Sequence, residues 1–362
     1  MTSRGRRGLG LLGLLLALAT ATQAQEQRAP APDYQGGEWH LERAAGKRVV
    51  AELEGSIHAP ALEAEEWLLV VAAAPRHALS SVERQWLWAE TGGRKSTGRA
   101  AREPGGRELL VLRVASLPEE GKGLRYLVRY ELTTAAVTLR PGPATPGQPH
   151  ERANARELRQ HLEKTKLFAF EDPGFAAWMR AQGLVRKDGE RDLAFGYRVL
   201  EALGKGFRYA YPPKSPARTC PEVARDGASD CGGLSALAVS ILRANRVPAR
   251  LLVGRWVVQP QQPEEPQFHV KFELWAEGIG WVPCDGSGAV QWRGGAQAAF
   301  GRCGANFLVM HVDPDLEVDS VHWGKKRYDF LQGALWWVTG RGTLEGKQEE
   351  SRWTVQVRGD GK

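Results

Sequence analysis

A cysteine, a histidine and an aspartate, the residue types of a thiol-based catalytic triad, follow one another as Cys231, His269 and Asp285. Apolar residues recur with helical spacing over residues 234–242, and the helix must end before Pro248, so Cys231 is predicted in its first turn. The unpaired N–H groups of a helix start lower the pKa of a thiol and can donate to an oxyanion. Cys231 is therefore a candidate nucleophile, with a buried structural thiol as the alternative.

The histidine and the aspartate fall in a predicted β-hairpin. The segment FHVKFELW alternates as a strand, AEGIG makes a turn, and WVPCDGS returns as the partner strand. His269 and Asp285 then lie roughly diagonal on adjacent strands, about 7–8 Å apart at the backbone, which an imidazole and a carboxylate can bridge. Asp285 would hold one ring nitrogen of His269 while the other serves Cys231, although a single histidine on a strand can also be structural.

The surrounding sequence resembles the transglutaminase-like superfamily of papain-type folds in four motifs: SDCGG at 229–233, LRANRVPAR at 242–250, HVKFE at 269–273 and WVPCD at 281–285. The resemblance is specific over about residues 195–290 and weaker in the β-rich region before them. It implies Cys231 as nucleophile, His269 as general base and acid, and Asp285 as the orienting acid. It also implies an oxyanion donor upstream of the helix, with Tyr209 as the candidate and Tyr211 as the alternative, although both can equally be core aromatics.

Three positions depart from the motifs of the superfamily. Ser229 stands where a glycine is usual, and Arg246 replaces the glycine that stops the helix, so Asn245 or Arg246 is expected in a left-handed conformation. Lys271 replaces a tryptophan and lies on the same strand face as His269. Its ammonium could disfavour protonation of the imidazole or bind an acidic substrate group. The departures leave the triad intact and the substrate preference open.

The rest of the chain predicts an α+β fold, in which a Cys-bearing helix packs on an antiparallel sheet that carries the histidine and the aspartate. Short β-branched and aromatic runs from about residue 45 to 140 predict an antiparallel sandwich. Trp67, Trp86 and Trp88 are expected in its core or on a sheet face, with a carbohydrate-binding surface as the alternative. The expected domains are a signal peptide over 1–24, the sandwich over 25–140, a linker over 141–155, the transglutaminase-like domain over 156–300 and a C-terminal extension packed on the core over 301–362.

The first residues and the overall charge bear on the compartment. Three arginines, an apolar run of about ten residues and the small Ala24 predict a cleaved signal peptide, so the protein is expected in the periplasm or secreted. No later segment predicts a membrane span. The net charge of +7 is dispersed and falls to +4 without the three signal arginines, which argues against nucleic-acid binding.

Cysteine and histidine spacing predicts neither a metal site nor a cofactor. The sequence has no CxxC or HExxH motif, and the HVDPD segment around His311 is more typical of a turn than of a cation site. With Cys231 free, at most one disulfide can form among Cys220, Cys284 and Cys303, and the pairing stays open.

The function expected from this resemblance is that of an exported, cysteine-dependent acyl-transfer enzyme acting on peptide or glutamine-type amides through a thioester. Water as acceptor would make it an amidase or protease, and a lysine amine would make it a crosslinking enzyme. Peptide or protein substrates of the cell envelope would match the compartment. The alternative is a non-catalytic peptide- or protein-binding module that retains the fold.

Overall fold

The computed structural model describes residues 32–115, 122–144, 153–258, 267–320 and 322–358. The chain divides into two units, 1–32 and 33–362, and the description below concerns the second. The predicted signal peptide lies outside the described residues. Within the described ranges, every helix is too short or too polar to cross a lipid bilayer.

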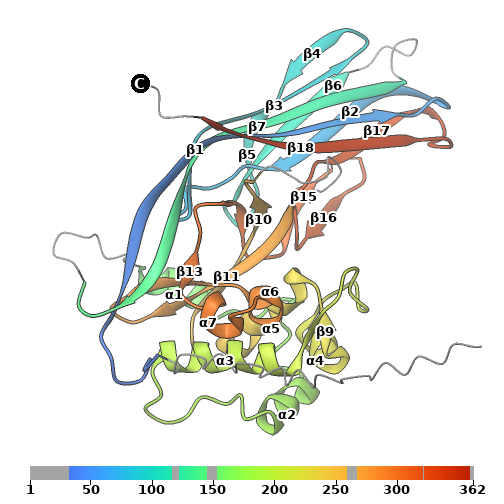
Figure 1. The fold of residues 1–362 in the computed structure, drawn as a ribbon. Coiled ribbons are helices and arrows are strands. Elements are labelled where there is room, and N and C mark those ends of the chain that lie inside the picture. Colours follow the sequence, from blue (N-terminus) through green and yellow to red (C-terminus); the bar gives the residue numbers. More distant parts are fainter. Residues whose placement is uncertain (1–31, 116–121, 145–152, 259–266, 321, 359–362) are drawn as a thin grey trace, which may run out of the picture. The chain divides into compact units, whose positions relative to one another are not determined.

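Two antiparallel sheets form a β-sandwich (Figure 1). The first has the order β18-β1-β7-β3-β4, with β13 paired to β7, and the second has the order β17-β2-β6-β5. Apolar side chains of both sheets fill the space between them, including the fully buried Trp67, Tyr130 and Trp353. The strand bounds are β1 Trp39–His58, β2 Leu62–Ala72, β3 Ser80–Thr91, β4 Arg94–Thr97, β5 Arg99–Arg102, β6 Glu108–Ala115, β7 Gly123–Pro141, β13 Arg302–Cys303, β17 Leu335–Gly342 and β18 Gln348–Arg358.

The C-terminal strands join this sandwich. Strand β17 pairs with β2, and β18 pairs with β1, in both cases antiparallel. The strand pairing thus places residues 335–358 with the N-terminal sheets. The predicted domain boundaries at residues 140, 155 and 300 stay predictions.

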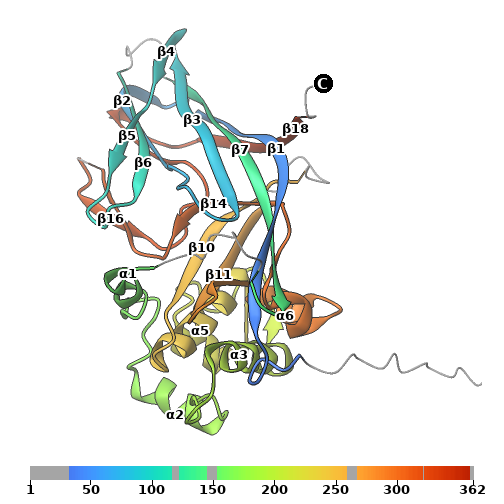
Figure 2. The same cartoon turned by 90° about the vertical axis from the view of Figure 1, so that its left-hand side faces the viewer.

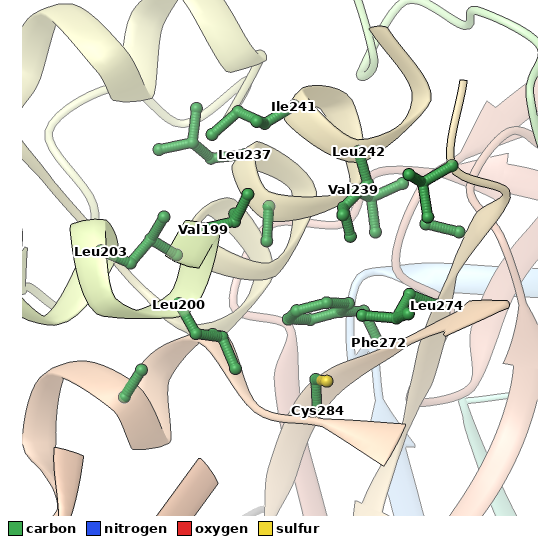
Figure 3. Packing of buried hydrophobic residues seen from close by; sticks show 14 of the residues in the cluster. Val199, Leu200, Leu203, Leu237, Val239, Ile241, Leu242, Phe272, Leu274 and Cys284 are labelled. Atoms are coloured by element: carbon green, nitrogen blue, oxygen red, sulfur yellow. The ribbon is translucent and has the colours of Figure 1, made fainter. Parts of the chain in front are cut away.

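The helical half is built on a third antiparallel sheet with the order β12-β11-β10-β14 (Figure 2). One face of this sheet packs against α3 and α5, and Figure 3 shows Phe272, Leu274 and Cys284 turned toward the apolar side chains of these helices. Cys284 is buried there, as the strand alternation predicts. The bounds of the sheet strands are β10 Ala249–Trp256, β11 Phe268–Ala276, β12 Gly280–Cys284 and β14 Phe307–Val312. The helices are α1 Ala155–Gln160, α2 Pro173–Ala181, α3 Asp192–Gly206, α4 Cys220–Asp226, α5 Cys231–Ala244, α6 Gly286–Gln291 and α7 Gly295–Ala299.

The opposite face of the same sheet packs on residues of the sandwich half. Phe307 and Leu252 share an apolar cluster with Leu79 and Val137, and Trp256 packs against it. Strand β13, which lies between α7 and β14 in the sequence, pairs with β7 of the sandwich, so the chain that leads into β14 is also attached to this side. This buried support matters because the predicted site residues lie at one end of β11. Two short pairs, β8 Arg208–Tyr209 with β9 Ala228–Ser229 and β15 Leu316–Asp319 with β16 Lys325–Tyr328, complete the described elements.

Helix α5 begins and ends as its sequence predicts. Asp230 caps the start, where its Oδ1 accepts a hydrogen bond of 3.0 Å from the N–H of Gly233. Arg246 follows the end with φ of 62°, the left-handed conformation that the missing glycine would adopt without strain. Asn245 keeps a negative φ of −98° and donates from Nδ2 to the carbonyl groups of Leu184 and Ile241.

Candidate active site

Cys231 is the first residue of α5 and is half-buried. Before it, Asp230 is bound by the guanidinium of Arg218, whose Nη2 lies 2.7 Å from Oδ2. Burial raises the pKa of the Cys231 thiol to about 12, and the negative charges of Asp230 and Asp285 add to this, while a hydrogen bond from the Val270 backbone opposes it. The direction is opposite to the one predicted from a helix start, because burial and the two carboxylates outweigh the amide dipoles.

His269 and Asp285 meet at an edge of the sheet. Strand β12 pairs with β11 over Phe272–Ala276, so in the described residues the first part of β11 has no strand partner on that side. Asp285 follows the last residue of β12, and its Oδ2 lies 2.7 Å from Nε2 of His269. The structure therefore brings these two predicted residues into hydrogen-bond contact across the diagonal of the hairpin. Nδ1 is the ring nitrogen that remains for a thiol.

The carboxylate of Asp285 is completely buried and has further donors. Its Oδ1 accepts from the Ser287 hydroxyl at 2.9 Å and from the Gly288 amide at 2.7 Å. Burial alone would raise the pKa of Asp285, but its interactions with His269 and Lys271 prevail and hold the pKa well below its usual range. Asp285 is thus an anion that also caps α6, which fixes its position relative to the imidazole.

The Cys231 thiol, at the start of α5, lies near the same end of β11. The Val270 backbone, next to His269 in sequence, hydrogen-bonds to Cys231, and the charge of Asp285 acts on its pKa. The imidazole is stacked on Trp256, with ring centroids 4.2 Å apart and an interplanar angle of 22°, which restricts its rotation. An imidazole held by a carboxylate can take the proton of a thiol that it contacts, and the thiolate can then attack a carbonyl carbon.

A groove of about 740 Å³ opens over Cys231. Six of its seventeen lining residues are aromatic, and the exposed fractions of Tyr211 at 70%, Phe268 at 41% and Tyr209 at 38% mark its rim. Its two arginines are engaged by carboxylates: Arg218 binds Asp230, and Arg327 binds Asp315 and Glu317. The groove is lined by Tyr209, Tyr211, Pro216, Ala217, Arg218, Asp230, Cys231, Gly232, Trp256, Gln267, Phe268, Val270, Arg327, Tyr328, Asp329, Phe330 and Gln332.

Tyr209 lies in this groove because β8 pairs in parallel with β9, which places it beside Ser229. Burial raises the pKa of Tyr209 to about 12, with Cys231 and Asp230 adding to the effect, so its hydroxyl is a donor at neutral pH. Its role as oxyanion donor stays a prediction. Of the two glycines after Cys231, Gly232 lines the groove, whereas a Cβ on Gly233 would come within 2.0 Å of the buried Ser229 Oγ. Gly233 therefore makes close packing possible and leaves no room for substrate.

Lys271 is almost completely buried and does not belong to the groove wall. Its Nζ lies 3.1 Å from Oδ2 of Asp285, the oxygen that also binds His269. The expectation that Lys271 could bind an acidic substrate group is therefore wrong, because the ammonium is sealed beneath aromatic rings. Its expected effect on the imidazole is compatible with this position.

Two further motif residues hold the sheet together. Glu273 lies 2.8 Å from Arg250 and 3.3 Å from His77, and all three are buried or nearly so. Burial would raise the pKa of Glu273, but Arg250 and His77 lower it to about 2. The acidic residue of the HVKFE motif and the arginine of the VPAR motif thus form one buried ion pair with a structural role.

A segment that sequence reasoning missed completes the site. Gln332 donates from Nε2 to the carbonyl of His269 at 3.0 Å, and the ring of Phe330 packs on the first turn of α5, 3.1 Å from where a Cβ on Gly232 would stand. His311 holds the same segment, because its Nε2 accepts from the Leu331 amide at 3.1 Å. Its Nδ1 bonds to the Asp313 carbonyl, so the HVDPD segment is a turn. These residues have no recognisable spacing relative to the triad, and only the folded chain brings them to it.

Residues 179–286 match the family model of the transglutaminase-like superfamily. The chain carries a transglutaminase-like domain. Its fold also resembles the crystal structure of a candidate cysteine protease from Cytophaga hutchinsonii, with a TM-score of 0.50, 10% identity, and coverage of 88% of this chain and 100% of that chain. The periplasmic domain of TgpA from Pseudomonas aeruginosa aligns with a TM-score of 0.35, 15% identity, and coverage of 68% of this chain and 92% of that chain. No curated protein sequence matches significantly.

At the level of the family, the transglutaminase-like domain is typical of cysteine-type enzymes. All four cysteines are free thiols in the structure, and Cys220, Cys284 and Cys303 are buried. In the part of the chain that the structure describes, no group of three or more His, Cys, Asp or Glu side chains could hold a metal ion.

Proposed function

We propose that the protein is an exported, cysteine-dependent acyl-transfer enzyme that acts on peptide or glutamine-type amides through a thioester. Two observations support the proposal: the His269–Asp285 hydrogen bond at the sheet edge, and the Cys231 thiol at the start of α5, which lines a groove. Export rests on the predicted signal peptide at residues 1–24.

In the proposed reaction, Nδ1 of His269 takes the proton of the Cys231 thiol while Sγ attacks the amide carbonyl carbon. Because burial raises the pKa of the thiol, the proposed mechanism has the base remove the proton as the attack proceeds. The imidazolium then gives its proton to the leaving nitrogen, the C–N bond breaks, and ammonia or an amine departs. Water or a primary amine attacks the thioester, passes its proton to His269, and releases Cys231.

The developing oxyanion has donors at the helix start. The backbone N–H of Cys231 is the first of these, and the protonated Tyr209 hydroxyl is the second. Asp285 keeps Nε2 of His269 oriented and stabilises the imidazolium that forms during transfer.

The groove supports a peptide-like acyl donor. Six aromatic residues line it, and both of its arginines are bound by carboxylates, so it favours apolar or aromatic side chains next to the reacting amide over acidic ones. If the protein is exported, peptides or proteins of the cell envelope are the accessible substrates.

The test is incubation with a glutamine-containing peptide that has flanking aromatic residues, together with a labelled primary amine. An adduct with release of ammonia identifies amine transfer, ammonia alone identifies an amidase, and a shortened peptide identifies a protease. Cys231→Ala and His269→Ala should each abolish the product, whereas Cys303→Ala removes a buried thiol outside the groove and should retain it. Product that persists in Cys231→Ala would refute the proposal.

The alternative is a binding module with an unreactive thiol, and the raised pKa of Cys231 is the observation that favours it. Thiol labelling separates the two. The enzyme requires Cys231 to be alkylated faster than the three buried cysteines, and His269→Ala to slow this reaction. Equal, slow labelling of all four thiols, with peptide bound but not converted, would identify the binding module.

A further inference from the structure

We propose that Lys271 is a positioning residue that shares the orienting carboxylate with His269 and makes transfer of the Cys231 proton to the imidazole less favourable in the resting enzyme. The inference rests on the proposed function, because it concerns the same site. The superfamily motif has a tryptophan at this position, so the effect would be a property of this chain and not of the fold.

Among the described residues, the structure pairs the ammonium of Lys271 with one carboxylate, that of Asp285. Nζ lies 3.1 Å from Oδ2 of Asp285, and the side chain is 2% exposed. Aromatic rings surround it: Trp256 at 4.6 Å, and Trp292 and Phe307 each at 5.6 Å from Nζ to the ring centroid. Cation–π contacts of this kind stabilise a charged ammonium in a site that water does not reach. The cation is therefore built into the site and is not a surface charge that solvent would screen.

One carboxylate oxygen thus serves two donors. Oδ2 of Asp285 is 2.7 Å from Nε2 of His269 and 3.1 Å from Nζ of Lys271. In a plain His–Asp pair, the full negative charge favours the imidazolium. Here the ammonium neutralises that charge and also repels a second positive charge on the ring. Lys271 therefore opposes transfer of the Cys231 proton to His269 before substrate arrives.

The other charged groups around the imidazole do not offset this effect. From α5 come Cys231, which is neutral at rest, and the capping Asp230, which is bound by Arg218. On β11 itself, Glu273 is bound by Arg250 and His77. The nearby Cys303 on β13 is buried, and burial raises the pKa of its thiol to about 11, so it is also neutral.

The test is the pH dependence of Cys231 alkylation by iodoacetamide, followed by peptide mass spectrometry in the full-length protein from pH 5 to pH 10. In the wild type, the rate should stay low below neutral pH and rise only toward alkaline pH. A fast plateau between pH 5 and pH 7 would show a preformed thiolate–imidazolium pair and would overturn the proposal. This arm needs no variant and therefore does not depend on how a substitution folds.

The variants separate charge from packing. Lys271→Met keeps the length and apolar stem and should move the alkylation profile to lower pH by about 1–3 units, the effect of removing a like charge close to the imidazole. Lys271→Arg restores the charge and should return the profile toward that of the wild type. Lys347→Met is the matched control, because Lys347 also contacts a carboxylate, at 3.0 Å from Glu349, and lies 4.9 Å from the centroid of a tryptophan ring, that of Trp336, on the sandwich.

An unchanged profile in a folded Lys271→Met protein, judged by its near-UV circular dichroism, would refute the role of Lys271. Because alkylation needs no substrate, the result is independent of the acyl-transfer assay. A shifted profile without any acyl transfer would retain the inference and reject the proposed function.

Discussion

The buried pair of Lys271 and Asp285 predicts a large loss of stability when one partner is removed. Asp285→Asn preserves shape but leaves the ammonium of Lys271, 2% exposed, without its counterion. Removing one partner of a buried pair costs about 3–5 kcal/mol, limited here because Lys271 can lose its proton. Lys271→Met leaves Asp285 with His269 and two other donors and should cost less, about 1–3 kcal/mol.

The double variant distinguishes this pair from two independent packing sites. If the charges depend on each other, the loss in the double variant should be smaller than the sum of the single losses by about 1–3 kcal/mol. Guanidinium unfolding at pH 7, followed by tryptophan fluorescence, measures the stability of the wild type, the two single variants and the double variant. The exposed pair Lys347–Glu349, with side chains 34% and 41% exposed, is the control and should couple by no more than about 1 kcal/mol. Additive losses at Lys271 and Asp285 would refute the reasoning.

Two further predictions concern the backbone at Arg246 and the loss of stability at acid pH. Arg246→Gly should stabilise the protein by about 0.5–1 kcal/mol, because glycine adopts the φ of 62° without strain; an unchanged or lower melting temperature in differential scanning calorimetry would contradict this. Burial, helped by Arg107, lowers the pKa of His311 to about 3, so the unfolded chain takes up this proton first and stability should fall as the pH drops from about 6.5. Glu273, with a folded pKa of about 2, should add a second loss below about pH 4.5; urea unfolding at pH 7.5, 5.5 and 4 measures both, and a constant free energy would refute them.

The local chemistry of the site could be predicted from the sequence because short segments encode it. Helical spacing and a capping residue place Cys231 at a helix start, and the alternation of the hairpin directs Cys284 into the core. The diagonal of the same hairpin brings His269 to Asp285. Each of these relations spans fewer than about twenty residues, where backbone geometry alone limits the outcome.

The state of the thiol could not be predicted in the same way. A helix start favours a thiolate, but the pKa of Cys231 also depends on which side chains cover it and which carboxylates lie near it. Phe330, almost one hundred residues later, packs over the same turn of the helix. The burial of Lys271 likewise depends on rings from three separate segments, Trp256, Trp292 and Phe307. These are tertiary effects that no local pattern reports.

The C-terminal part of the chain forms part of the groove, which its own sequence does not indicate. Strands β17 and β18 each form one edge of a sandwich sheet. The segment just before them, residues 327–332, forms one wall of the groove. That segment is fixed at Gln332, which bonds to the His269 carbonyl, and at Leu331, which bonds to His311. This one wall of the groove therefore lies outside the matched family segment at 179–286, whereas the rest of the lining lies within it. In the proposed reaction, the matched segment would supply the reacting groups, and residues 327–332 would add to the substrate contacts made by the rest of the groove.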